Sequence, residues 1–267
     1  MTGRAVRRRD GGTVAVLEVV DVGVRFGGVV ALSSLSFTID QGQICALIGP
    51  NGAGKTTLFN VVSRIYEPNT GSVRFDGADL LALPAHRIAE LGVGRTFQNL
   101  ALVPGLSVLD NVKVGGHARS RGGFWASALR LPPVPSQERE LTSRSMDVLE
   151  RLSLAHLAHR PCAGLPYGTL KRIEFARALV GQPKLLMLDE PASGLTHGEV
   201  DELGALIRQI RDEFSLTVLL VEHHMAMVMS ISDKVVVMDL GQKIAEGLPS
   251  QVREDPRVIA AYLGAPA

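Results

Sequence analysis

Apolar and polar residues alternate along 16–37, on both sides of a turn at Gly27 and Gly28. Alternation with a period of two is typical of strands that bury one face and expose the other. The stretch therefore predicts a partly exposed antiparallel sheet. Segment 72–75, after the turn that begins at Pro68, is expected to add a further strand to it.

Of three later runs, 44–48 and 185–188 are apolar throughout, and 216–221 is apolar except for Thr217. Short runs of this kind indicate strands that are buried on both faces, as in a parallel sheet. The remaining expected elements are two edge strands near 235–238 and 243–246, and helices from Thr56, over 198–212 and over about 250–263.

Between 99 and 165 the pattern becomes helical and irregular, and a Gly-Gly pair and three prolines interrupt it. We interpret this stretch as a helical subdomain inserted into the parallel core. No segment repeats another, so 15–267 is expected to form one unit and not two in tandem.

The 267 residues carry a formal net charge of +1, and 46% of them are hydrophobic. A chain of this size can bury one large core with an inserted lobe, and its near-neutral charge disfavours nucleic acid as the main ligand. Cys45 lies in an apolar run and Cys162 follows a proline, without metal-ligand or disulfide spacing. We expect two buried thiols in a reducing compartment such as the cytoplasm.

No apolar stretch of the sequence approaches the roughly 18 residues that a membrane span needs. Segment 1–13 contains four arginines, but the apolar core of a signal peptide does not follow them. We therefore expect neither export nor self-insertion, and interpret 1–14 as a disordered tail.

A phosphate-binding motif lies between the run 44–48 and the helix expected from Thr56. It is a complete Walker A loop, made of Gly49, Pro50, Asn51, Gly52, Ala53, Gly54, Lys55, Thr56 and Thr57. Its glycines let consecutive N–H groups face the β- and γ-phosphates, Lys55 neutralises their charge, and Thr56 offers a hydroxyl to Mg²⁺. The loop predicts nucleoside triphosphate binding and an α/β fold of the P-loop NTPase (RecA-like) type.

Two acids, Asp189 and Glu190, directly follow the apolar run 185–188. A buried strand that ends in carboxylates presents them to solvent or to a ligand. Asp189 is expected to hold Mg²⁺, directly or through water, and Glu190 to polarise the attacking water. The pair favours hydrolysis of the triphosphate over transfer of its phosphoryl group to a small molecule.

Together with these motifs, further segments resemble the ATP-binding subunits of ABC transporters, over nearly the whole chain. Gln98 lies where the Q-loop glutamine would be, His223 matches the switch histidine, and Phe26 stands where an aromatic ring stacks on adenine. Segment 193–196 resembles the D-loop. The ABC signature is matched by Leu165, Pro166, Tyr167, Gly168 and Thr169, followed by a helical segment.

The resemblance implies that two ATP-binding subunits close head to tail, with each ATP between one Walker A loop and the other subunit's signature. A signature helix starting near Thr169 would aim its N-terminus at the γ-phosphate. Gln98 would contact Mg²⁺ and report γ-phosphate occupancy to the lobe, and His223 would orient Glu190 with its water. The lobe would dock onto a membrane-spanning partner, so that closure and hydrolysis drive transport.

The signature departs from the family pattern at Pro166, where a serine is usual. The missing hydroxyl and N–H would each reach the γ-phosphate, a loss of about 1.5–3 kcal/mol if nothing compensates. Gly168 preserves the close approach, Thr169 supplies a substitute hydroxyl, and proline suits the start of a helix. Since Lys55 and Glu190 are present, we expect a weakened site that still hydrolyses ATP.

Longer strings, at 95–99, 106–112, 221–225 and 255–264, are similar to the importers of branched-chain amino acids, although His224 replaces a usual aspartate. This resemblance implies an MgATP-hydrolysing subunit on the cytoplasmic face of the plasma membrane, for branched-chain amino acids or related small solutes such as urea and amides. Its partners would be two transmembrane permeases, a second identical or different ATP-binding subunit and, indirectly, a solute-binding protein. The alternatives are a soluble ABC ATPase without a membrane partner, or a weakly hydrolysing regulatory subunit.

Overall fold

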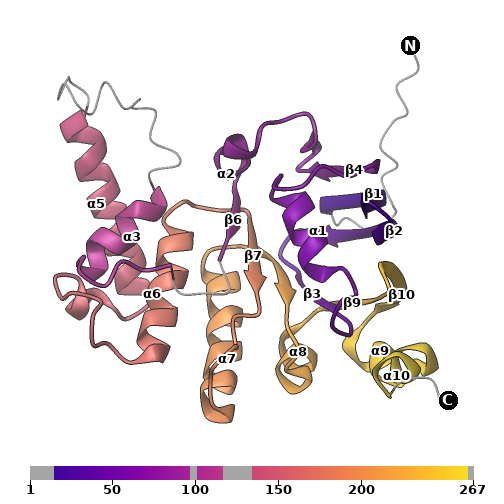
Figure 1. Cartoon of the computed structure of the whole chain (residues 1–267). Helices are drawn as coiled ribbons and strands as arrows, with labels where there is room; N and C mark the ends of the chain where they lie inside the picture. Colours follow the sequence, from indigo (N-terminus) through magenta and orange to yellow (C-terminus); the bar gives the residue numbers. More distant parts are fainter. Residues whose placement is uncertain (1–14, 97–100, 117–133, 264–267) are drawn as a thin grey trace.

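The computed structural model describes residues 15–96, 101–116 and 134–263. The tail expected at 1–14 and the Q-loop candidate Gln98 lie outside these ranges. Two β-sheets form the centre of the molecule, and helices pack around and beside them (Figure 1).

The first sheet is antiparallel, with the strand order β2-β1-β4-β5. Its strands are β1 (Ala15–Phe26), β2 (Val29–Asp40), β4 (Thr70–Phe75) and β5 (Ala78–Asp79). Buried and exposed positions alternate along much of β1 and β2, as at Phe37, Thr38 and Ile39. The antiparallel sheet predicted from the alternating pattern is therefore confirmed.

The second sheet has the order β10-β9-β3-β8-β7-β6 and is parallel except for the pairing of β10 with β9. Every residue of β3, β7 and β8 is buried, which explains why their sequences are apolar except for the terminal Asp189 and Thr217. The strands are β3 (Ile44–Ile48), β6 (Val93–Arg95), β7 (Leu185–Asp189), β8 (Thr217–Val221), β9 (Lys234–Asp239) and β10 (Gln242–Gly247).

The expectation of two edge strands after 234 is right for β10 and wrong for β9. Strand β9 lies between β3 and β10 and pairs with both. Its four central residues, from Val235 to Met238, are all buried, which is the burial that an interior strand requires. The other edge strand, β6, has only three residues and was not predicted.

The helices gather in groups around the sheets. Helices α3, α5 and α6 pack together at one end of the molecule (Figure 1), and the division of 99–165 into a separate inserted subdomain stays a prediction. The helices are α1 (Lys55–Val62), α2 (Ile88–Leu91), α3 (Val108–Gly116), α5 (Val134–Arg151), α6 (Tyr167–Leu179), α7 (His197–Glu213), α8 (Met225–Ile231), α9 (Pro249–Glu254) and α10 (Pro256–Leu263), with 3-10 turns at Ala85–Arg87 and Ala155–Leu157.

The single closing helix expected over 250–263 is two helices, α9 and α10. Pro256 has no N–H to donate and its ring disfavours helical backbone at the preceding residue. Asp255 accordingly has extended φ and ψ of −70° and 120°. Its carboxylate accepts a hydrogen bond from the N–H of Arg257 at 2.8 Å, so one residue ends α9 and caps α10.

Both cysteines are buried, as expected, and burial raises the pKa of the Cys45 thiol to about 12. Within the described ranges, no helix combines the length and the apolar character that crossing a membrane requires. The sheet order places β8 between β3 and β7. Because these three strands are parallel, their carboxyl ends meet at one edge, where ligands bind in folds of this kind.

Candidate active site

The Walker A loop connects β3 to α1 through backbone that requires glycine. Gly49 and Gly54 have φ of 152° and 97°. A Cβ atom on Gly49 would lie 2.1 Å from the Met238 carbonyl oxygen, and one on Gly54 would lie 2.6 Å from that of Ala31. Any side chain at either position would displace neighbouring backbone, so the tight turn that exposes the loop's amides depends on these glycines.

Lys55 begins α1 and folds back across the loop. Its Nζ atom donates to the carbonyl oxygens of Gly49 at 2.7 Å and Pro50 at 3.0 Å. Burial lowers the pKa of Lys55, and the carboxylates of Glu190 and Asp189 oppose that change. No side chain caps the N-terminus of α1, so its amides and the ammonium group of Lys55 together suit an anion.

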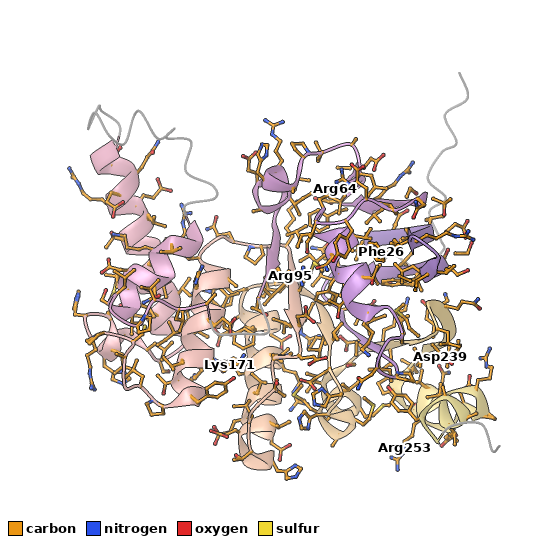
Figure 2. The ribbon with its side chains drawn as sticks, in the orientation of Figure 1. Phe26, Arg64, Arg95, Lys171, Asp239 and Arg253 are labelled. Atoms are coloured by element: carbon orange, nitrogen blue, oxygen red, sulfur yellow. The ribbon has the colours of Figure 1, made fainter. Side chains whose placement is uncertain are left out.

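Asp189 ends β7 and contacts a residue that sequence reasoning did not select. The guanidinium of Arg95 (labelled in Figure 2), at the end of β6, donates to Asp189 Oδ2 at 2.9 Å. It also donates to Asn60 of α1 at 2.9 Å and to Ser63, the C-cap residue of α1, at 3.2 Å. Burial raises the pKa of Asp189, while the hydrogen bond and charge of Arg95 oppose this rise. Arg95 therefore joins β6, β7 and α1 around the Walker B carboxylate.

Glu190 has an unusual backbone conformation. Its φ of 46° lies in the left-handed region that residues other than glycine seldom adopt. A hydrogen bond from its N–H to the Val221 carbonyl oxygen, at 2.9 Å, holds the residue beside the end of β8. Strain of this kind is typical of functional sites, where the surrounding structure imposes it, and it agrees with the predicted catalytic position of Glu190.

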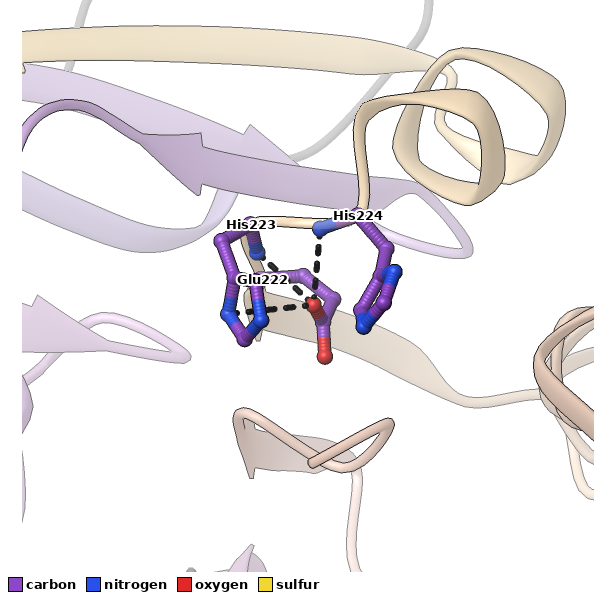
Figure 3. A group of neighbouring side chains, drawn as sticks. All are labelled: Glu222, His223 and His224. Atoms are coloured by element: carbon purple, nitrogen blue, oxygen red, sulfur yellow. Dashed lines mark hydrogen bonds and ion pairs between the residues drawn. The ribbon is translucent and has the colours of Figure 1, made fainter. Parts of the chain in front are cut away.

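His223 directly follows Glu222 at the end of β8, and its side chain is 60% exposed. Its Nδ1 atom lies 3.6 Å from Glu222 Oε2 (Figure 3). The ring of His224 is close by, with a centroid distance of 4.7 Å. The ligand atoms of these three residues are near enough to share a metal ion, but the buried Glu222 oxygens already accept three backbone N–H groups. We therefore assign this cluster to loop structure.

The signature residues lie at the start of α6, which begins at Tyr167, earlier than the expected Thr169. Pro166 is the N-cap residue, with an extended ψ of 148°, and no side chain caps the helix. The Tyr167 hydroxyl donates to the Ser193 carbonyl oxygen at 3.1 Å, which links the signature to the D-loop of the same chain. Leu165, Gly168 and Thr169 are partly exposed beside them.

Phe26 is 47% exposed at the end of β1 (Figure 2). The ring of Tyr66, shortly after α1, meets it edge to face at 5.1 Å. This exposed aromatic pair suits a nucleobase, and Tyr66 was not predicted.

Two functional candidates, Arg95 and Glu222, were overlooked for the same reason. Each lies in a segment, 95–99 or 221–225, that was interpreted only through its similarity to the branched-chain amino acid importers. The signal that singled out Asp189, a charged residue directly after a buried strand, also marks Glu222. Arg95 becomes recognisable only when its contact with Asp189, which lies 94 residues away, is known.

Comparison with known proteins identifies the chain. Residues 32–193 match the family described as ABC transporter, and residues 242–267 match the branched-chain amino acid ATP-binding cassette transporter family. The chain belongs to the ABC transporter family. Its cassette is 43% identical to the high-affinity branched-chain amino acid transport ATP-binding protein BraF of Pseudomonas aeruginosa, over 93% of this chain and 98% of that protein.

Solved structures agree with the fold of this cassette. A crystal structure of the ADP conformation of an ATP-binding cassette matches it with a TM-score of 0.82 at 30% identity, covering 94% of this chain and all of the other. A dimeric cassette bound to ADP and phosphate, at 22% identity, shares the fold with a TM-score of 0.70, over 87% of this chain and 98% of the other. The cassette is thus an ATP-binding protein of the branched-chain amino acid transport type, an ATPase coupled to transport. Its family generally uses MgATP.

Proposed function

We propose that this cassette powers the import of branched-chain amino acids, or of related small solutes such as urea and amides, from the cytoplasmic face of the plasma membrane. The observation that carries the proposal is the convergence of Lys55, Asp189, Glu190 and His223 at the carboxyl ends of the adjacent strands β3, β7 and β8. The identity with BraF along nearly the whole chain supports the solute class.

ATP is bound mainly by the Walker A loop. Backbone amides of 49–57 and the Lys55 ammonium hold the β- and γ-phosphates, and Phe26 stacks on adenine. Oxygens of Thr56, Asp189 and Gln98 are ligands of the type that Mg²⁺ prefers, and Arg95 donates to Oδ2 of Asp189. These residues would hold the ion, which would supply neutralisation of the phosphate charge.

Hydrolysis relies on two residues that follow the Walker B strand and its neighbour. Glu190, fixed by its bond to Val221, polarises the attacking water. His223, exposed at the end of β8, contacts the γ-phosphate and orients Glu190 with that water. These roles agree with the position of both residues at the sheet edge that carries Lys55.

The signature acts on the ATP of a second subunit. In Figure 1, α6 and α1 lie on opposite sides of β7, so the signature of one chain is remote from its own Walker A loop. A head-to-tail dimer brings the N-terminus of each α6, with Leu165, Pro166, Tyr167, Gly168 and Thr169, to the other subunit's phosphates.

The permeases dock at a groove of about 250 Å³ between β6, α3 and α6. Its lining includes Thr96 and Ala101, which flank the segment containing Gln98, and the charged side chains of Glu174 and Arg177. A partner helix in this groove would touch the residues on either side of that segment and the signature helix. The partner's position would thereby depend on nucleotide state.

Affinity purification of the tagged protein from detergent-solubilised membranes of its host tests this proposal. We expect two multi-span permeases to co-purify, with or without a second ATP-binding subunit, and the host to lose leucine uptake when Lys55→Ala replaces the wild type. Exposed Lys184→Ala is the control and should leave uptake unchanged. Recovery of soluble partners only, with the protein absent from membranes, would contradict the transport role and leave the ATPase assignment intact.

A further inference from the structure

Glu222 is a buried acid that connects two loops of the active site. Only 1% of the residue is exposed. Its Oε1 atom accepts a hydrogen bond from the N–H of Ala192 at 3.0 Å, and its Oε2 atom accepts from the N–H groups of His223 and His224 at 2.7 and 3.0 Å (Figure 3).

The two oxygens of this carboxylate thus accept hydrogen bonds from different segments of the chain. Ala192 lies in the loop between Glu190 and the D-loop, whereas His223 and His224 form the switch loop. A buried carboxylate is costly unless its oxygens find donors, and here three amides supply them. Only a side chain with two acceptor oxygens can satisfy donors on both sides, because an amide would turn its NH₂ group toward one of them.

The loop that Glu222 holds is also fixed at its far side. The Tyr167 hydroxyl donates to the carbonyl oxygen of Ser193, the residue after Ala192. A chain of hydrogen bonds therefore runs from the signature through the D-loop to the backbone of His223. In a head-to-tail dimer its two ends would act on different ATP molecules.

We propose that Glu222 is a positioning residue for ATP hydrolysis, which acts through His223 by fixing the switch loop to the D-loop. This inference rests on the role proposed above for His223. Glu222 does not touch nucleotide. It fixes the backbone of His223 and thereby the position from which the imidazole side chain extends. An error of about 1 Å in such a position lowers turnover by about 100-fold.

The test uses the transporter complex recovered through the tagged chain, with Glu222→Gln, His223→Ala and both together. We expect Glu222→Gln to lower kcat by about 10- to 100-fold while KM and binding of the fluorescent analogue TNP-ATP change by less than about twofold. In the His223→Ala background the same substitution should have no further effect on kcat. Glu213→Gln, an exposed glutamate at the end of α7, is the matched control and should behave as wild type.

Glu222→Asp provides a second variant if Glu222→Gln does not fold. The shorter side chain can still accept from the amides just after it, as aspartate does in turns, but it cannot also reach Ala192. We expect reduced kcat with a thermal unfolding midpoint within a few degrees of wild type.

The outcomes separate this inference from the function on which it rests. Full turnover in His223→Ala would contradict the proposed role of His223, whatever Glu222 does. A loss in His223→Ala combined with wild-type turnover in Glu222→Gln or Glu222→Asp would overturn only the inference about Glu222. An equal loss from Glu222→Gln in both backgrounds would also overturn it, since the effect would not pass through His223.

Discussion

Arg95 and Asp189 form an ion pair whose side chains are only 14% and 9% exposed. Removing one partner of a buried pair costs about 3–5 kcal/mol, because the other charge is left without compensation. This pair lies at the edge of a site, where water can partly replace the guanidinium. We therefore expect Arg95→Met to lower the free energy of unfolding by about 2–4 kcal/mol, measured by urea denaturation.

Arg87→Met is the control for that prediction. Arg87 pairs with Glu90 at 3.6 Å, and the two side chains are 58% and 50% exposed. Exposed pairs contribute little, so its loss should change the free energy of unfolding by less than about 0.5 kcal/mol. Equal effects of the two substitutions would show that the Arg95 pair does not hold β6, β7 and α1 together.

Single residues could be predicted where their chemistry is local. The Walker A glycines, Lys55 and the two acids at the end of β7 lie within short strings whose spacing has a mechanical reason. The hydrogen bonds of Glu222 to Ala192 and of Arg95 to Asp189 join residues 30 and 94 positions apart. Such partners depend on the order of strands in the sheet, which one sequence does not reveal.

At the scale of elements, helices α3 and α6 approach closely at Gly115. A Cβ atom there would lie 1.8 Å from the Arg177 carbonyl oxygen. In open space, alanine would stabilise a helix by about 1 kcal/mol relative to glycine. We expect Gly115→Ala instead to destabilise the protein by about 1–3 kcal/mol, because backbone of α6 must shift.

Denaturant unfolding of the two single variants Gly115→Ala and Gly105→Ala, compared with wild type, measures this effect. Nothing lies within 4 Å of a Cβ atom on Gly105, so the control should change the free energy of unfolding by less than about 0.5 kcal/mol. If Gly115→Ala were as stable as wild type, the crossing of α3 and α6 would be looser than the structure describes.

Elements were predictable from periodicity, and their neighbours were not. The apolar runs at β3, β7 and β8 are too short and too continuous for amphipathic helices, which made them recognisable as buried strands. Strand β9 has the same continuous apolar character over its four central residues, yet it was expected at an edge. The break that Pro256 makes in the last helix was not predicted.

At the scale of the whole molecule, the proposed active site requires two copies of the cassette fold. Glu190→Gln retains the size of the side chain and removes the carboxylate that polarises water, so ATP should persist and hold the dimer closed. We expect this variant to elute as a dimer in MgATP and as a monomer in MgADP, measured by size exclusion with light scattering. Adding Lys55→Ala should abolish the dimer. A monomer in MgATP, alone and with the membrane partner, would refute the head-to-tail arrangement.

We expect Pro166 to weaken that dimer. As the N-cap residue of α6 it offers the opposite γ-phosphate neither a hydroxyl nor an N–H. Pro166→Ser restores both, and a hydrogen bond to a charged group contributes about 1.5–3 kcal/mol. In the Glu190→Gln background we therefore expect the dimer Kd in MgATP, measured by analytical ultracentrifugation, to fall by about 10- to 100-fold.

A matched control for Pro166→Ser exists at Pro84, which is the N-cap residue of the turn Ala85–Arg87 and has a similar extended backbone. Pro84→Ser changes the same atoms at a position far from the signature, so the dimer Kd should stay within about twofold of the parent. Tightening by Pro166→Ser alone would show that the signature faces phosphate in the dimer and that proline weakens this contact. An unchanged Kd would mean that Thr169 or the free amides of α6 already supply the contact that a serine at this position would make.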